Sequence, residues 1–256
     1  GKPGIGGNLN LVTPLLTGVG DSKVSYVAGG DIRLTAPQGY VRGPDRAKAE
    51  LGAEIHLKGA SIYADTAIAL PSGRLVLTAA QDLTLGDNAR IDMAGRATDF
   101  FDEKRYSWGG DVELESTHGD LRIGGGAVVD LSADYNHAGT LKLTALEGLV
   151  AAEGTISGAA RNGNNAADPA LRNGSIDIRA GTLADFVALN RKLTENGITE
   201  KRSFVIKTGD LVIGDEVKAR HVSIAAGGGD LAIIGRIDAS GPQPGRSRLS
   251  GRGHLA

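Results

Sequence analysis

Apolar and polar residues alternate in short stretches of this chain, and one such phrase recurs along most of its length. Each copy begins with a small residue and a polar residue and continues as an apolar, polar, apolar alternation that ends at a turn. Because successive side chains of a β-strand point to opposite faces, this alternation predicts strands with one buried and one exposed face. Copies lie at residues 30–36, 53–59, 73–79, 110–116, 139–145, 174–180 and 220–226.

Similar short strands are predicted between the copies, for example at residues 82–86, 120–124 and 209–214. The copies are roughly 20 to 46 residues apart, so that one repeat holds about three strands. Gly, Asp and Asn link most of these strands, which excludes a regular alternation of strands and helices. A propeller would show blades of four antiparallel strands, and a sandwich would show tight hairpins with aromatic core residues; neither pattern occurs.

The sequence therefore predicts an all-β fold, a right-handed parallel β-helix (β-solenoid), in which equivalent strands of successive turns stack at about 4.8 Å. Residues 1–256 are expected to form a single β-helix segment of a longer protein, because the chain begins and ends within the pattern. Aromatic residues make up only 4% of the chain, so the predicted interior consists of Leu, Ile, Val and Ala. Its 39 glycines are expected to supply the positive φ of tight corners.

Residues 182–202 break the strand pattern and predict a short helical insertion. Three apolar residues recur there at helical spacing: Phe186, Leu189 and Leu193. Residues 182–185, Thr-Leu-Ala-Asp, resemble a capping box, and Asn196-Gly197 is a typical stop signal. We expect the apolar face of this helix to pack on the β-structure; the alternative is a partner-binding role.

Residues 97–108 form an aromatic and charged insertion, for which two interpretations stand side by side. In one, a loop folds down over the β-structure and buries its rings. In the other, the rings and charges form a surface that contacts a glycan or a host-cell receptor. The candidate recognition residues are Phe100, Phe101, Arg105, Tyr106 and Trp108. Residues 159–172 and 241–253 are predicted to be a surface loop and an unpaired tail.

Composition narrows the function classes. A net charge of −2 with 23% charged residues predicts a surface of nearly balanced charge. Such a surface does not favour binding of nucleic acid. The chain has no cysteine, so disulfides, thiolate catalysis and cysteine-bound zinc are excluded. It has no apolar run long enough to span a membrane and no signal-peptide core at its start. We expect a protein that does not span the membrane and whose export signal lies elsewhere in a longer chain.

The motifs of common catalytic sites are missing, and no catalytic, cofactor or metal site is predicted. His56 and His221 fall on outward strand positions, where neighbouring turns could align two histidines. The acidic pairs at 102–103 and 215–216 come nearest to a carboxylate site. Glycosidases need two carboxyl groups about 5 to 10 Å apart, and parallel β-helices include pectin-degrading enzymes. A polysaccharide lyase or hydrolase is therefore the alternative function.

Several phrases resemble filamentous haemagglutinin-like proteins: Gly-Gly-Asp-Val-Glu-Leu at 109–114, Gly-Thr-Leu-Lys-Leu-Thr-Ala at 139–145, and above all the run at 174–241. The resemblance covers most of the chain and implies a shaft segment of a very large Gram-negative exoprotein at the cell surface. Members of this family act in adhesion, biofilm formation or delivery of a C-terminal toxin.

The same resemblance implies export through an outer-membrane transporter of the two-partner secretion type. The Asn-Pro-Asn-Leu signature of the family's N-terminal secretion domain is absent from this chain. Another part of the parent chain would therefore engage the transporter. The expected function is structural and adhesive, without catalysis and without cofactors, and the expected location is secreted at the bacterial surface.

Overall fold

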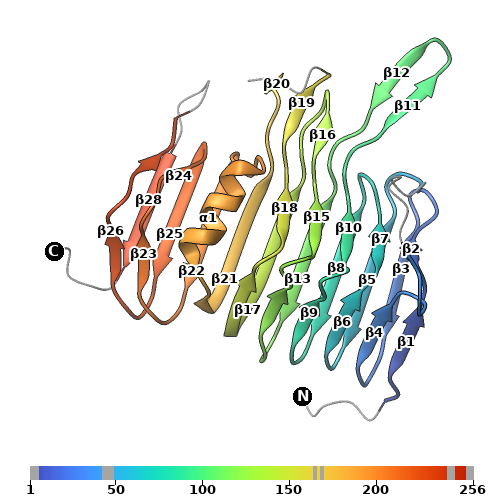
Figure 1. Cartoon of the computed structure of the whole chain (residues 1–256), viewed down its shortest axis with the longest axis horizontal. Helices are drawn as coiled ribbons and strands as arrows, with labels where there is room; N and C mark the ends of the chain where they lie inside the picture. The colour runs from blue at the N-terminus through green and yellow to red at the C-terminus, as the bar shows by residue number, and fades with distance from the viewer. Residues whose placement is uncertain (1–5, 42–48, 164–165, 168–169, 241–245, 252–256) are drawn as a thin grey trace.

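The computed structural model describes residues 6–41, 49–163, 166–167, 170–240 and 246–251. These residues form mostly β-structure with one short helix, α1 (Phe186–Glu195). The largest sheet is entirely parallel and strongly curled, and smaller parallel sheets accompany it (Figure 1). No helix in this part of the chain is long and apolar enough to cross a membrane.

The strands fall into three rows, and the chain follows the rows in the same order. No third-row strand is described between residues 36 and 53, and α1 takes the place of another. The first row, defined by parallel pairing, contains β3 (Lys23–Val27), β5 (Glu54–Gly59), β8 (Arg74–Ala79), β13 (Asp111–Ser116), the start of β17 (Thr140–Ala152), the start of β21 (Ser175–Leu183), β22 (Lys201–Ile206), β25 (His221–Ala226) and β28 (Arg246–Gly251). Its register keeps like residues in line, so that Leu75 lies between Ile55 and Val112.

The second and third rows complete each repeat. The second row holds β1 (Leu9–Val12), β4 (Ile32–Thr35), β6 (Ile62–Asp65), β9 (Leu83–Leu85), β14 (Leu121–Ile123) and the ends of β17 and β21, with β23 (Leu211–Ile213) and β26 (Leu231–Ile233) as a separate pair. The third row holds β2 (Leu15–Thr17), β7 (Ala67–Ala69), β10 (Arg90–Asp92), β15 (Val128–Asp130) and β18 (Thr155–Ser157), with β24 (Val217–Lys218) and β27 (Ile237–Asp238) as a separate pair.

The interior is a continuous apolar cluster of branched aliphatic residues and alanine, as the alternation predicts. Glycine at the start of the phrases has a different role from the one expected. A Cβ on Gly139 would lie 1.9 Å from the carbonyl oxygen of Gly110, and a Cβ on Gly110 would lie 2.5 Å from that of Gly73. Among the described glycines, positive φ occurs at others, such as Gly52. Close approach of neighbouring turns, not φ, therefore requires glycine at these corners.

Helix α1 takes the third-row place between β18 and β24, and it contacts both strands (Figure 1). Phe186, Leu189 and Leu193 are buried against the β-structure, as their spacing predicts. The helix begins later than the capping-box interpretation predicted. Asp185 is the N-cap and accepts a hydrogen bond from the amide of Ala188, at 2.9 Å, whereas residue 182 still belongs to β21.

The copies of the phrase do not all lie in one row, and one further expectation is wrong. The phrase at 30–36 forms β4, which pairs with β1 and β6 in the second row, while the other copies lie in the first row. Residues 246–251 of the expected unpaired tail form β28, which pairs in parallel with β25; residues 241–245 and 252–253 lie outside the described part of the chain. Alternation alone identifies a strand, and the strand's neighbours decide its row.

Candidate functional site

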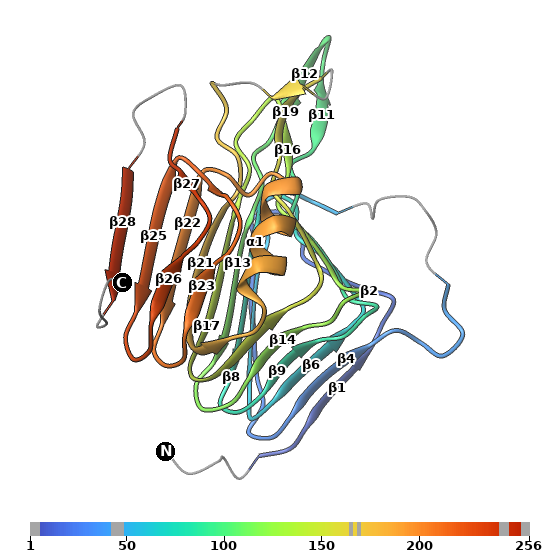
Figure 2. The ribbon, with the colours of Figure 1, turned by 60° about the vertical axis from the view of Figure 1, so that its left-hand side comes forward.

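The aromatic insertion forms an antiparallel hairpin, β11 (Ala97–Phe100) and β12 (Glu103–Tyr106). It leaves the β-structure after β10 and projects well beyond it (Figures 1 and 2). Three shorter strands extend from the neighbouring repeats on the same side: β16 (Ala133–Asp134), β19 (Ala160–Asn162) and β20 (Ala166–Ala167). The hairpin and these strands together are called the hairpin surface below.

The rings at the tip and base of the hairpin are exposed to solvent. Phe101 is 92% exposed, Phe100 is 57% exposed and Trp108 is 58% exposed. The rings of Phe100 and Phe101 meet edge to face with their centroids 4.9 Å apart. The interpretation of a loop that buries its rings is therefore wrong for these residues, because the insertion forms its own hairpin and extends away from the β-structure.

Phe101 has a φ of 57°, in the left-handed region. A bulky side chain seldom occupies this region, because its Cβ crowds the backbone there. Glycine or asparagine would fit the same hairpin position with less strain.

The hairpin register separates the candidate residues onto two faces. Residues paired across an antiparallel ladder share a face, and faces alternate along the strand. Phe100 pairs with Glu103 and residue 98 pairs with Arg105, which places Phe100 and Arg105 on one face. Tyr106 lies on the other face, where its ring packs at a tilt against Tyr135 with centroids 4.5 Å apart. The structure thus brings Phe100 and Arg105 together and gives Tyr106 a packing role.

Polar contacts fix the base of the hairpin. Ser72 donates to the carbonyl oxygen of Trp108 at 2.6 Å, and Asn136 donates to the carbonyl oxygen of Tyr106 at 2.9 Å. Arg96 forms an ion pair of 2.6 Å with Asp92 at the point where the chain leaves β10. These contacts hold the hairpin on a rigid support. Sequence reasoning missed Tyr135, because its partner lies on another repeat.

The two histidines on outward strand positions lie apart in the described part of the chain, and one acidic pair contacts an arginine. In the first row His56 is in register with Ser25 and Val76, and it contacts Glu54 at 2.6 Å. His221 is aligned with Lys201, so the two histidines do not meet. Of the acidic pair at 215–216, Glu216 forms an ion pair with Arg236. No group of three or more His, Asp or Glu among the described residues could hold a metal ion.

Two hollows lie on the outer face of the second row, in succession along β4 and β6. The first, about 370 Å³ in volume, is lined by Arg33 and Tyr63 among others, and is called the Tyr63 hollow. The second, about 340 Å³ in volume, is lined by Thr35, Asp65 and Arg90 among others, and is called the Arg90 hollow. Both volumes fall within the range of small-ligand sites, about 300–1,000 Å³.

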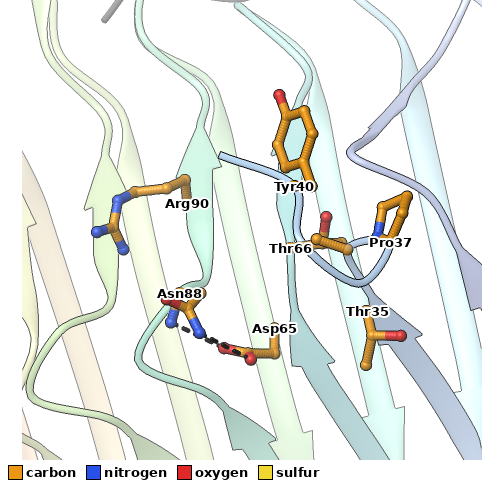
Figure 3. Close-up of a pocket in the computed structure, with 8 residues that line it drawn as sticks. Thr35, Pro37, Tyr40, Asp65, Thr66, Asn88 and Arg90 are labelled. Carbon is orange, nitrogen blue, oxygen red and sulfur yellow. Dashed lines mark hydrogen bonds between the residues drawn. The ribbon is translucent and has the colours of Figure 1, made fainter. Parts of the chain in front are cut away.

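Contacts inside the Arg90 hollow hold its polar groups in fixed positions. Asp65 accepts hydrogen bonds from the backbone amide of Asn88, at 2.8 Å, and from its side-chain amide, at 3.1 Å (Figure 3). Arg90 Nη1 donates to the carbonyl oxygens of residues 87, 89 and 126. In Figure 3 Arg90 and Asn88 lie on one side of the hollow and Thr35 and Pro37 on the other.

The Tyr63 hollow contains a cation–π pair. The guanidinium carbon of Arg33 lies 4.6 Å from the centroid of the Tyr63 ring. Burial raises the pKa of the Tyr63 hydroxyl, and the negative charge of Asp65 raises it further, so this hydroxyl stays protonated and can donate a hydrogen bond.

No family model matches this chain, and no curated protein or solved structure matches it either.

Proposed function

We propose that this chain is a right-handed parallel β-helix and serves as a structural and adhesive shaft segment of a large secreted bacterial surface protein. The three rows support the first part of this proposal, because a chain that returns to the same rows with parallel pairing winds as a solenoid. A right-handed winding follows the general preference of parallel crossovers. Its function would be to space and display recognition surfaces, without catalysis and without a cofactor.

The adhesive part of the proposal rests on one observation, the strained and exposed Phe101. A bulky ring at a φ of 57° is unfavourable for folding, and its 92% exposure means that packing does not offset the strain. A recognition role gives a reason for such a ring. We propose that the exposed face of the hairpin binds a host-cell receptor or a glycan. The rings of the hairpin would stack on apolar sugar faces, and Arg105 would contribute hydrogen bonds.

Export would use an outer-membrane transporter of the two-partner secretion type, engaged by another part of the parent chain. This placement, at the bacterial surface, fits a chain without cysteine whose stability comes from backbone pairing between turns.

The test is a glycan-array and epithelial-cell binding assay on the purified chain and on a Phe101→Ala, Trp108→Ala double variant. Tyr106 is left intact, because its ring packs against Tyr135 and supports the fold. The matched control is Tyr26→Ala, which removes a partly exposed ring from β3 in the first row. The proposal predicts saturable binding that the double variant loses and the control retains. Equal binding by all three proteins, or binding by none, would contradict the adhesive role and leave only a spacer.

A further inference from the structure

The Arg90 and Tyr63 hollows lie next to each other on one face of the same two strands, and the two together are called the groove below. The outward residues of β4 are Arg33 and Thr35, and those of β6 are Tyr63 and Asp65. The first of each pair lines the Tyr63 hollow and the second lines the Arg90 hollow. Residues two apart on a strand are about 7 Å apart, so the hollows follow one another directly.

We infer that this groove binds an uncharged oligosaccharide chain, at a site separate from the hairpin surface. Its length suits an extended ligand, and both hollows carry an aromatic ring. Tyr63 lies in one, and Tyr40, which is 45% exposed, lies in the other (Figure 3). Aromatic rings bind the apolar faces of sugars, while polar side chains beside the rings bind the sugar hydroxyl groups.

The charges of the groove favour hydroxyl groups over an ionic ligand. Arg33 and Arg90 line it, and neither forms an ion pair with a described carboxylate. Asp31, Asp65 and Asp82 line the same groove, so that neither sign of charge dominates. A sugar hydroxyl both donates and accepts, and it can therefore use guanidinium donors and carboxylate acceptors together.

Arg90 is held in place at one side of the groove before any ligand arrives. Its Nη1 is engaged by three carbonyl oxygens, at 3.1, 2.8 and 2.7 Å, which fixes the plane of the guanidinium. In Figure 3 its guanidinium points away from Tyr40 and Thr66, on the side where Nη1 donates to the carbonyl oxygen of residue 126, so Arg90 forms a wall of the groove. Such preorganisation lowers the entropy cost of binding.

An extended peptide suits this groove less well than a sugar chain. Peptides that add to β-structure use the free backbone groups of a sheet edge. Here β4 pairs with β1 on one side and with β6 on the other, and β6 pairs in turn with β9. The groove therefore lies over a sheet face whose backbone is already paired, and it offers side chains only.

Isothermal titration of the purified chain tests the inference, with three uncharged hexasaccharides as probes: α-1,4-linked glucose, β-1,4-linked glucose and β-1,4-linked N-acetylglucosamine. We expect saturable binding of at least one probe. Tyr40→Ala and Arg33→Gln should each weaken it by about tenfold or more, the effect of losing one aromatic or charged contact. The matched control, Tyr26→Ala, and the Phe101→Ala, Trp108→Ala variant should bind as tightly as the parent chain.

Several results would overturn the inference. One is the absence of saturable binding by all three hexasaccharides; another is unchanged affinity in both groove variants. Equal loss in the Tyr26→Ala control would show a general effect on the fold. Tighter and strongly salt-dependent binding of an oligogalacturonate would show that the groove selects an acidic ligand. Loss only in the hairpin variant would place sugar binding at the hairpin surface instead.

Discussion

The side chain of Arg202 donates a hydrogen bond of 2.6 Å to Oδ1 of Asn190, and both residues are buried, with 0% and 1% of their surface exposed. Arg202 occupies an inward position of β22, in register with Ile176 and Val222. It also donates to the carbonyl oxygen of Ile198 at 2.7 Å. This arginine therefore joins helix α1 to the β-structure from inside.

Removal of the Arg202 guanidinium should destabilise the protein and loosen α1. Burial lowers its pKa to about 10, so the group is still charged at neutral pH and is satisfied only by neutral oxygens. Arg202→Met would leave those buried acceptors unpaired, and we expect a loss of about 3 kcal/mol in unfolding free energy. Urea denaturation measures the loss, and amide exchange within residues 186–195 should accelerate.

Arg179→Met is the matched control for this variant. Arg179 lies on the outer face of β21, and its ion pair with Asp177 is exposed to solvent. Exposed pairs contribute about 0.5 kcal/mol or less, so this change should be nearly neutral. If both methionine variants lost the same stability, the interior arginine would not anchor the helix.

Corner aspartates form a ladder between repeats. Asp82 Oδ1 accepts from the amide of Asp120 at 2.9 Å, and Asp120 Oδ1 accepts from the amide of Leu149 at 2.9 Å. Asp82→Ala removes one acceptor, and it should cost about 1 kcal/mol. Asp82→Asn should restore most of the loss, because Asn8 accepts from the amide of Asp31 in the equivalent place. Thermal unfolding compares the variants, and an asparagine variant as unstable as the alanine variant would show that charge matters rather than the acceptor.

Glu113 makes the stability of the folded protein depend on pH, through its contacts on the outer face of the first row. A hydrogen bond from Lys142, at 2.6 Å, lowers the pKa of this carboxyl, and Arg74 adds to the effect. A lowered folded pKa means that the stabilisation is present above the unfolded value of about 4.3 and is lost as pH falls through the folded value. Because both cations are partly exposed, we expect a contribution of only about 0.5–1 kcal/mol.

Glu113→Gln should therefore flatten the fall in stability below about pH 4.3. Lys142→Gln should remove the same pH-dependent part of the unfolding free energy. The double variant should lose little more stability than either single variant. Urea denaturation across this pH range measures all four proteins. Additive losses from the two single variants would show that the residues act independently.

The hairpin should respond oppositely to changes at Phe101 and Tyr106. Phe101→Gly relieves a left-handed backbone and loses no buried contact, so stability should be retained or increase by up to about 1 kcal/mol. Tyr106→Ala loses the ring contact with Tyr135 and should cost about 1 kcal/mol. Amide exchange in residues 97–106 reports both effects locally. A loss of hairpin protection in the glycine variant would show that the Phe101 ring supports the fold.

The strands could be predicted because alternation is a local property. The alternation within residues 73–79 is enough to predict β8. The spacing of Phe186 and Leu189 predicts α1 in the same way. The row in which a strand lies depends instead on pairing between repeats. The phrase at 30–36 therefore has the same alternation as the other copies, although β4 pairs in a different row.

The groove and the buried arginine could not be predicted, because their groups come together only through stacking of the repeats. Tyr40, Asp65 and Arg90 are far apart in sequence and meet in one hollow. Arg202 follows a lysine at the start of β22, where the sequence suggests exposure to solvent. Its buried position is favourable only because α1 supplies Asn190 as a hydrogen-bond acceptor. The sequence allows either buried or exposed rings in residues 97–108, and in the hairpin Phe101 is exposed.

A distance between two spin labels tests most directly whether the repeats stack as one stiff column. Residues 76 and 223 share an outward column of the first row through five registered pairings, from Val76 through Glu113, Lys142, Asp177 and Ser203 to Ser223. The chain has no cysteine, so Val76→Cys and Ser223→Cys can be labelled selectively. Strands stacked about 4.8 Å apart predict a narrow distribution near 24 Å between the backbone positions. A broad distribution, or one centred far from this value, would contradict the account.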